Sequence, residues 1–254
     1  MQITHEFLFE RIRKNPVEHL GGYSPKLIHP YFVGYGNALR FHERPQVRGR
    51  LGLSEFLDWF RDNCYGGREG YAAFCLLLTD SEEKALELFF EFREIRLKEL
   101  DATTSFAASS ASDLSVGSDH EPISITSLTL HETMRTKTAL YFGNDSWLRE
   151  MWAMWSGYIW AEKDIGIENS QDAQNFYNFQ YWLDNRYKFS TSPNWGKLME
   201  FLGMGVNENA REQFYDHFEL FLEGSPPDGQ TKRMKEWIAA CLADVKERQE
   251  KGEL

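Results

Sequence analysis

The apolar positions between residues 81 and 98 recur with the period of an α-helix. Five of them follow the spacing i, i+3, i+4, i+7 and i+10: Ala85, Leu88, Phe89, Phe92 and Ile95. Ser81 offers an N-cap oxygen just before this stripe, and Glu82 and Glu83 suit the positive end of a helix dipole. The pattern therefore predicts a helix over residues 81–98.

Similar patterns predict helices along most of the chain. We expect them over residues 26–42, 53–64, 70–78, 145–163, 172–188, 195–202 and 207–222. A turn cluster at 225–229 ends the last of these, and an amphipathic C-terminal helix follows, with apolar positions Met234, Trp237, Ile238, Cys241, Leu242 and Val245. No long alternating pattern predicts a strand, so the expected fold class is all-α.

The middle of the chain has a different composition. Residues 101–127 contain eight serines and neither Lys nor Arg. Such a stretch cannot bury enough apolar surface to offset its ordering entropy, which predicts a flexible Ser/Ala-rich linker over 101–128. The expected division is a first helical repeat at 1–100 and a second at 129–254, the latter including the C-terminal helix.

Four blocks of sequence recur in the same order on both sides of this linker, at offsets of 122–125 residues. In the first block, Ile12-Arg13 and Leu20-Gly21 match Met134-Arg135 and Phe142-Gly143. In the second and third blocks, Gly34-Tyr35 matches Gly157-Tyr158, and Phe56-x-x-Trp59 matches Phe179-x-x-Trp182. In the fourth, Glu83-x-Ala85-x-Glu87-x-Phe89 matches Glu208-x-Ala210-x-Glu212-x-Phe214. This order predicts an internal duplication.

The residues shared by the two copies suggest structural roles. Gly34 and Gly157 fall inside predicted helices, where Gly costs about 1 kcal/mol relative to Ala, so we expect close helix packing there. The tryptophans Trp59 and Trp182 are expected in the two cores. Shared charges predict one salt bridge per copy, Arg13 with Glu91 and Arg135 with Asp216, unless these side chains are simply solvated.

These blocks resemble a family of small helical bacterial proteins found at polymorphic toxin loci, where its members look like immunity proteins. The resemblance covers both copies and implies a helical fold and a toxin-binding role. The second copy departs from the pattern, with Thr138 at the position of Pro16 and Asn144 after the shared glycine of Phe142-Gly143.

Signatures of catalysis are scarce. None of the His-Glu pairs extends to H-E-x-x-H, no glycine-rich phosphate loop or G-x-S-x-G elbow occurs, and the three cysteines form no C-x-x-C pair. We therefore expect no metal, no cofactor and no reaction. A hydrolase that uses Cys64 or a histidine in one copy stays open as an alternative.

The cysteine usage, the lack of an N-terminal signal pattern and the absence of a long apolar run predict a cytoplasmic protein that does not span a membrane.

The charge distribution suggests the kind of partner. The chain has 39 acidic and 28 basic residues, a net charge of −11 that argues against nucleic-acid binding. The second copy holds most of this excess, so we expect an acidic surface that binds a basic toxin, for example a nuclease, by occlusion. The predicted partner contacts are Glu162, Asp164, Glu168, Asp172 and Asp184. The alternatives are that these acids are only a solvated face, and that the protein is a self-associating scaffold, for example a homodimer.

Overall fold

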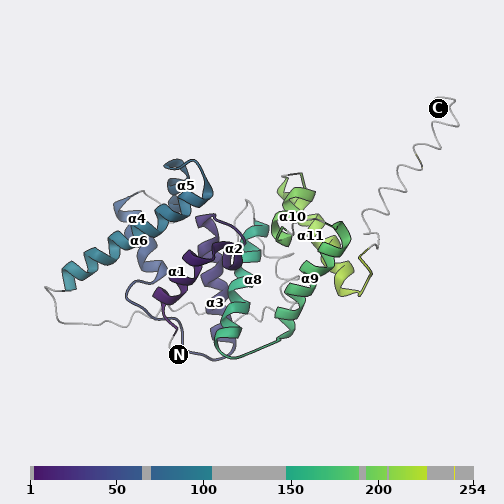
Figure 1. The fold of residues 1–254 in the computed structure, drawn as a ribbon, viewed down its shortest axis with the longest axis horizontal. Coiled ribbons are helices and arrows are strands. Elements are labelled where there is room, and N and C mark those ends of the chain that lie inside the picture. The colour runs from purple at the N-terminus through teal and green to yellow at the C-terminus, as the bar shows by residue number, and fades with distance from the viewer. Residues whose placement is uncertain are drawn as a thin grey trace, which may run out of the picture. The chain divides into compact units, whose positions relative to one another are not determined.

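The computed structural model describes residues 3–64, 70–104, 147–188, 193–204, 206–227 and 243. Over these residues the chain is all-α, and its one strand-like feature is a parallel bridge between Thr4 and Arg48. The helices in Figure 1 are α1 (His5–Lys14), α2 (Pro16–Leu20), η1 (Pro25–Leu27), α3 (Ile28–Phe41), α4 (Leu53–Asn63), α5 (Gly70–Leu77), α6 (Glu82–Thr104), α8 (Trp147–Asp164), α9 (Gln171–Tyr187), α10 (Trp195–Leu202) and α11 (Asn207–Leu222).

The helices predicted within the described residues are all present. Most begin and end within two residues of the predicted bounds, but α6 continues to Thr104, into the first residues of the predicted linker. The rest of that linker and nearly all of the predicted C-terminal helix lie outside the described residues. Helices α1 and α2 were not predicted, because they are short and interrupted by Pro16.

Local chemistry explains this N-terminal pair of helices. The Thr4 hydroxyl caps α1 by accepting a hydrogen bond from the Phe7 backbone N–H at 3.2 Å. Pro16 occupies the first turn of α2, where its missing N–H removes no helical bond. Gly21 ends α2 with a φ of 72°, a conformation that favours glycine. Leu20-Gly21, part of the first shared block, thus forms a turn, whereas its counterpart Phe142-Gly143 lies outside the described residues.

The chain divides into two compact units, Met1–Ala173 and Gln174–Leu254. In the first unit, α1, α4, α5 and α6 enclose an aromatic core. Phe89 of α6 makes an edge contact with Phe56 of α4 at a centroid distance of 5.1 Å, and its ring lies 5.6 Å from that of Tyr71 in α5. The Tyr71 hydroxyl donates a hydrogen bond to the Pro25 carbonyl, which ties α5 to η1.

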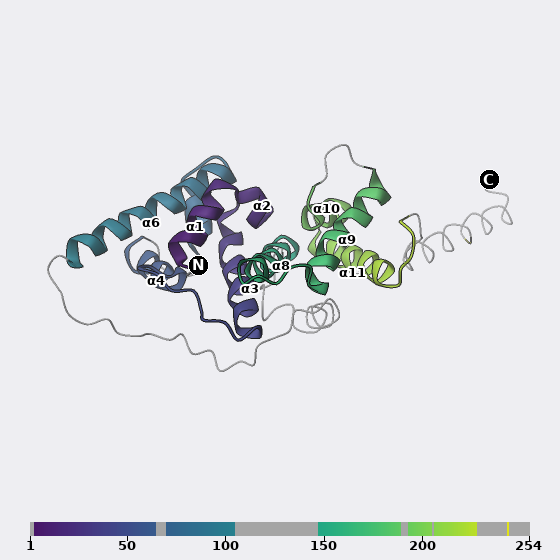
Figure 2. The same cartoon turned by 60° about the horizontal axis from the view of Figure 1, so that its bottom comes forward.

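Helices α3 and α8 of the first unit cross at two glycines, and they lie side by side in both Figure 1 and Figure 2. A Cβ added to Gly34 would lie 1.8 Å from the Met154 carbonyl oxygen, and one added to Gly157 would lie 2.1 Å from the Tyr31 carbonyl oxygen. Any side chain there would overlap the backbone of the facing helix, so the crossing requires glycine at both positions.

The second unit has an aromatic core of its own, formed by α9, α10 and α11. Phe179 of α9 makes an edge contact with Phe214 of α11 at 5.8 Å, and Phe214 lies 5.3 Å from Trp195 of α10. Phe179 also stacks on Trp182 at 6.3 Å with an interplanar angle of 18°. These ring arrangements match those of the first unit, where Phe56 stacks on Trp59 at 5.9 Å and 21°.

The boundary between the compact units differs from the predicted domain boundary. The sequence places the division in the linker at 101–128, whereas the boundary between the compact units falls between Ala173 and Gln174 in the chain. The reason is that α8 carries sequence of the second predicted copy but packs against α3 of the first. Sequence repeats and compact units are therefore two different divisions of this chain.

Candidate functional site

Asp164, a predicted partner contact, is engaged within the first unit. Arg11 of α1 donates two hydrogen bonds to the Asp164 carboxylate, at 2.6 and 2.8 Å, and the Tyr35 hydroxyl donates a third at 2.6 Å. The ion pair is mostly shielded from solvent, with exposed fractions of 17% and 11% for its two side chains. Burial and this hydrogen bond both raise the pKa of Tyr35 above its usual range.

Glu162, also a predicted partner contact, lies in the interior with 3% of its surface exposed. It accepts a hydrogen bond from His42 Nε2 at 3.0 Å and another from the Ser170 hydroxyl. Ser170 in turn caps α9 by accepting a hydrogen bond from the Ala173 backbone N–H at 3.1 Å. Glu162 therefore connects the end of α3 to the start of α9 and is not available to a partner in this conformation.

The remaining three predicted contacts have different surroundings. Asp172 is buried, with 7% of its surface exposed, and together with Glu162 it contributes to the raised pKa of Tyr158, after the larger effect of burial. Glu168 is exposed. Asp184 belongs to the second unit, where it is half-buried and accepts a hydrogen bond from Gln180 at 3.0 Å. Of the five, Glu168 is thus exposed, Asp164 and Asp184 are partly buried, and Glu162 and Asp172 are buried.

His19 lies beside the Arg11–Asp164 pair but is poorly suited to proton transfer. Its ring is buried 4.6 Å from that of Trp160. Burial, with a further contribution from the positive charge of Arg11, lowers the pKa of His19 to about 4. His19 is therefore neutral near pH 7 and packs as an aromatic ring.

The two described cysteines favour the thiol form. Burial raises the pKa of Cys75 to about 12 and also raises that of Cys64, which is half-exposed. A nucleophilic cysteine needs a thiolate, so both pKa shifts oppose that role. Within the described ranges, no group of three His, Cys, Asp or Glu side chains could hold a metal ion.

The predicted salt bridge between Arg13 and Glu91 is wrong. Arg13 pairs with Glu94, which lies nearly one helical turn further along α6. Both partners are nearly half exposed, so the pair contributes little to stability. The second predicted pair cannot be placed, because Arg135 lies outside the described residues.

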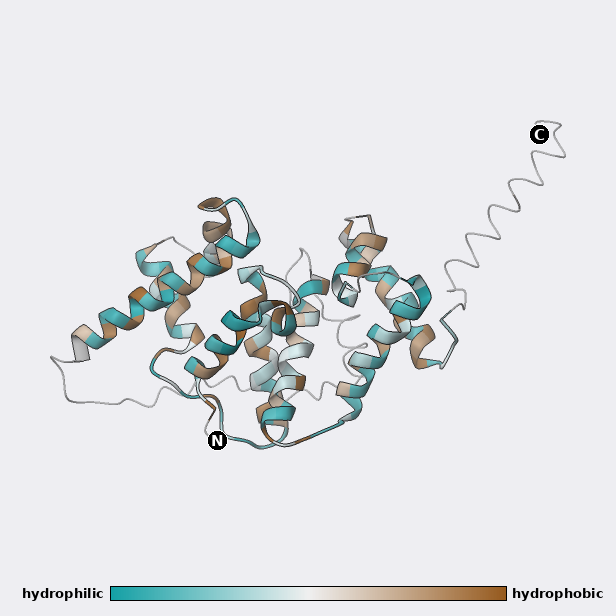
Figure 3. Cartoon of the chain, in the orientation of Figure 1, coloured by the Kyte–Doolittle hydropathy of each residue, from teal (hydrophilic) through white to brown (hydrophobic). Residues whose placement is uncertain are grey.

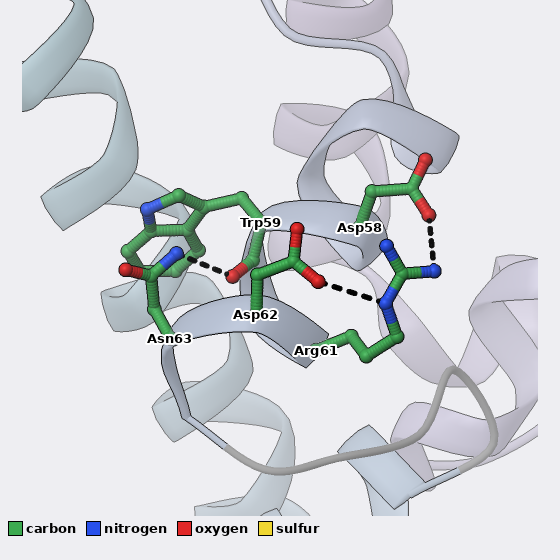
Figure 4. A network of polar contacts seen from close by, with 5 residues as sticks. All are labelled: Asp58, Trp59, Arg61, Asp62 and Asn63. Carbon is green, nitrogen blue, oxygen red and sulfur yellow. Dashed lines mark hydrogen bonds and ion pairs between the residues drawn. The ribbon is translucent and has the colours of Figure 1, made fainter.

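A polar network lies on the surface of α4 beside Trp59 (Figure 4). Arg61 pairs with Asp58 at 3.0 Å and with Asp62 at 2.9 Å, and the Asn63 amide donates a hydrogen bond to the Trp59 carbonyl at 2.8 Å. The paired residues all belong to α4 and lie one, three or four positions apart. The network is therefore the solvated face of α4 and indicates no ligand.

Large apolar side chains are exposed at positions that the sequence did not predict. Trp182, which was predicted in a core, is buried, as are Trp152, Trp155 and Trp195, whereas Trp59 is half-buried. The exposed set instead consists of other residue types and includes Leu77, Leu78, Tyr177, Tyr181, Phe201 and Met204. Helical periodicity offers a signal only for Tyr177 and Tyr181, which share a face of α9 opposite Phe179. Helix α5 is apolar on nearly all sides, so periodicity cannot separate its buried face from its exposed one.

A comparison with known protein families, with curated proteins and with solved structures finds no match to this chain. Among the described helices, none is both long enough and apolar enough to cross a membrane.

Proposed function

We propose that this protein is a cytoplasmic immunity protein that binds a basic bacterial toxin and neutralises it by occlusion, without a reaction of its own. The proposal rests on the sequence resemblance and on the surface of the molecule. Large apolar side chains are exposed on a chain with a net charge of −11, and such side chains are typical anchors of a protein interface. This exposure of large apolar side chains is the main structural support for the proposal.

The interior supports a binding role over a catalytic one. Three ionisable groups there have structural explanations: Asp164 neutralises Arg11, Glu162 accepts a hydrogen bond from the Ser170 hydroxyl, and burial keeps His19 neutral. Binding by electrostatic attraction and shape needs none of these groups to react. A basic partner would be attracted by the excess of carboxylates, which speeds encounter at low ionic strength.

We also infer that the chain contains two copies of one helical unit. The glycines at the α3–α8 crossing support this inference: Gly34 faces Met154 and Gly157 faces Tyr31, and both 157 − 34 and 154 − 31 equal 123. The contact that α3 makes with α8 is thus equivalent to the contact that α8 makes with α3, as expected for two copies of one unit. The matching stacks of Phe56 on Trp59 and of Phe179 on Trp182 are a second, independent correspondence.

The immunity role can be tested without knowing the toxin. We expect a strain that lacks this gene to be outcompeted by its own parent when the two grow in contact, and plasmid-borne expression of the protein to restore its survival. Growing the two strains on opposite sides of a filter, so that they share the medium without contact, controls for a general growth defect. Equal survival of the deletion strain in contact would exclude the immunity role under those conditions.

A self-associating scaffold is the second candidate, because the same exposed apolar side chains could also bind another copy of the chain. Light scattering across a range of protein concentrations separates the two. A scaffold gives a mass that rises with concentration, whereas an immunity protein that keeps its surface for a toxin stays at constant mass.

A further inference from the structure

The exposed residues that α9 contributes to the second unit are all uncharged. They are Gln174, Tyr177, Asn178, Tyr181 and Asn185, which we call the α9 face. Tyr181 is 70% exposed and Tyr177 is 47% exposed. The charged residues of α9 in this unit, Asp184 and Arg186, are half-buried and hydrogen-bonded to Gln180 and to the Pro227 carbonyl. Figure 3 colours α9 mainly teal and white, so the α9 face is hydrophilic although none of its side chains is charged.

The corresponding face of α4 is acidic. Phe56 of α4 and Phe179 of α9 are 123 residues apart, both are buried, and each stacks on the tryptophan three residues later. At the same offset, three carboxylates of α4 correspond to neutral side chains of α9: Glu55 to Asn178, Asp58 to Tyr181 and Asp62 to Asn185. Figure 4 shows two of these carboxylates paired with Arg61 at the surface of α4. Helix α4 therefore folds with an acidic face, and the fold gives no reason for a neutral one in α9.

Solvation gives no reason for it either. The chain has a net charge of −11, and exposed carboxylates favour solubility. The cores of protein interfaces differ from the rest of a protein surface in this respect, because they are depleted in Asp, Glu and Lys and enriched in Tyr. The composition of the α9 face is therefore typical of a contact surface.

The hydrogen-bonding groups of the α9 face are complementary to themselves. An amide both donates and accepts, and so does a tyrosine hydroxyl, whereas a carboxylate only accepts and a guanidinium only donates. Asn185 donates one amide hydrogen to the Tyr181 carbonyl at 2.9 Å, and its second hydrogen and its oxygen are further hydrogen-bonding groups. A two-fold dimer brings the same patch of two copies together, so it requires groups of this kind.

We propose that the α9 face binds the α9 face of a second copy of this chain in a two-fold dimer. Two acidic chains repel each other, and they approach at the least electrostatic cost through a neutral patch. A basic toxin is the wrong occupant, because it would be attracted by the carboxylates that this face lacks. The predicted C-terminal helix, which lies outside the described residues, is also unsuited, because its apolar stripe would bury the amides without hydrogen-bond partners. The dimer goes beyond the immunity role and leaves the rest of the surface to the toxin.

The dimensions of the α9 face predict a reversible dimer. From Gln174 to Asn185 the helix rises about 16 Å, or about three turns. One helix face of this length buries less than the roughly 800 Å² per partner of a standard interface, so we expect a dissociation constant in the micromolar range. Above that range the mass stays constant at two chains. The dimer is closed, unlike the self-associating scaffold, whose mass would rise beyond two chains.

Sedimentation equilibrium of the full chain tests the dimer. Between about 1 and 200 µM, we expect the mean mass to rise from that of one chain and to level off at that of two. The triple variant Asn178→Glu, Tyr181→Asp and Asn185→Asp gives α9 the carboxylates of α4 and sets like charges against each other. It should raise the dissociation constant at least about tenfold. Circular dichroism should show the helix content of the wild type, because α4 folds with the same side chains.

A control triple variant adds the same charge away from α9. Gln46→Glu, Ser54→Glu and Ala73→Glu replace exposed neutral residues of the first unit. At about 0.15 M salt, they should leave the dissociation constant unchanged within about twofold. Added salt gives an independent readout, because it screens the repulsion between acidic chains. It should leave the wild-type dimer as stable or more stable, whereas a dimer held by ion pairs would weaken.

Four outcomes overturn the proposal. The first two concern the wild type: a mass of one chain up to about 200 µM, and a mass that rises beyond two chains. The others are dimerisation of the α9 triple variant with the affinity of the wild type, and equal weakening by the control triple variant. The immunity role is tested separately by the survival of the deletion strain, so either inference can fail while the other stands.

Discussion

Arg11 and Asp164 are 153 residues apart in the chain but form a two-pronged ion pair, with hydrogen bonds of 2.6 and 2.8 Å. The pair joins α1 to the end of α8, and Tyr35 of α3 adds a third hydrogen bond to the same carboxylate. Three helices thus meet at one acidic group. The carboxylate that the sequence suggested for a partner is therefore an internal link of the first unit.

Loss of the Asp164 carboxylate should destabilise the protein. We expect Asp164→Ala to lower the free energy of unfolding by about 3 kcal/mol, because Arg11 is left partly buried without a counter-charge. Urea denaturation measures the change. The double variant Arg11→Met with Asp164→Leu should lose less than the sum of its single variants, since no charge is left unpaired.

The exposed pair of Asp58 with Arg61, drawn in Figure 4, is the matched control for this prediction. We expect Asp58→Ala to change the free energy of unfolding by less than about 1 kcal/mol, because solvent screens the pair. Equal effects of Asp58→Ala and Asp164→Ala would contradict the internal role of Asp164.

The glycine crossing gives a second prediction, tested by alanine substitutions on one helix. Gly34→Ala should destabilise the protein by several kcal/mol, because the new Cβ would overlap the Met154 carbonyl. Gly36→Ala, two residues away, should stabilise it by about 0.5–1 kcal/mol, because the nearest atom is at an ordinary 3.5 Å and alanine favours the helix. Thermal unfolding of the two variants measures both, and a stabilising Gly34→Ala would exclude the close crossing.

The lowered pKa of the buried His217 predicts how the stability of the protein depends on pH. Its Nδ1–H donates to the Gln213 carbonyl at 2.5 Å, since a carbonyl only accepts, so Nε2 accepts from the Tyr187 hydroxyl at 2.6 Å. Burial lowers the pKa of His217 to about 4, below its unfolded value of 6.5. The unfolded chain therefore binds the proton first, and stability is lost as the pH falls from 6.5 towards 4.

Urea denaturation between pH 6.5 and pH 4.5 checks this expectation. His217→Gln should reduce the loss of unfolding free energy over that range by up to about 1.4 kcal/mol per pH unit. A slope that is identical in the wild type and in His217→Gln would show that His217 does not titrate as its surroundings require.

The Arg13–Glu94 pair should contribute little, because both side chains are nearly half exposed. A double-mutant cycle with Arg13→Ala and Glu94→Ala should give a coupling energy below about 1 kcal/mol. The same cycle with Glu91→Ala should give no coupling. Coupling to Glu91 in place of Glu94 would restore the pairing that the sequence suggested.

The sequence alone determined the secondary structure of the described residues to a large extent. Helical periodicity and capping residues located α3 to α6 and α8 to α11, because an apolar stripe and an N-cap are local properties of the chain. It missed α1, although Leu8, Phe9 and Ile12 are all buried there, because so short a helix depends on what packs against it. The mid-helix glycines of the shared blocks predicted a close helix packing, which the α3–α8 crossing confirms.

The roles of the charged and apolar side chains depend instead on contacts between distant parts of the chain. Net charge and residue type made Glu162, Asp164 and Asp172 candidates for a surface, but long-range contacts with Arg11, Tyr35, His42 and Ser170 place the first two inside, and Asp172 is buried as well. The same holds for Leu77 and Met204, whose exposure depends on which sides of α5 and α10 the neighbouring helices cover. Local sequence sets the helices, whereas burial is a property of the assembled fold, because it depends on residues that are far apart in the chain.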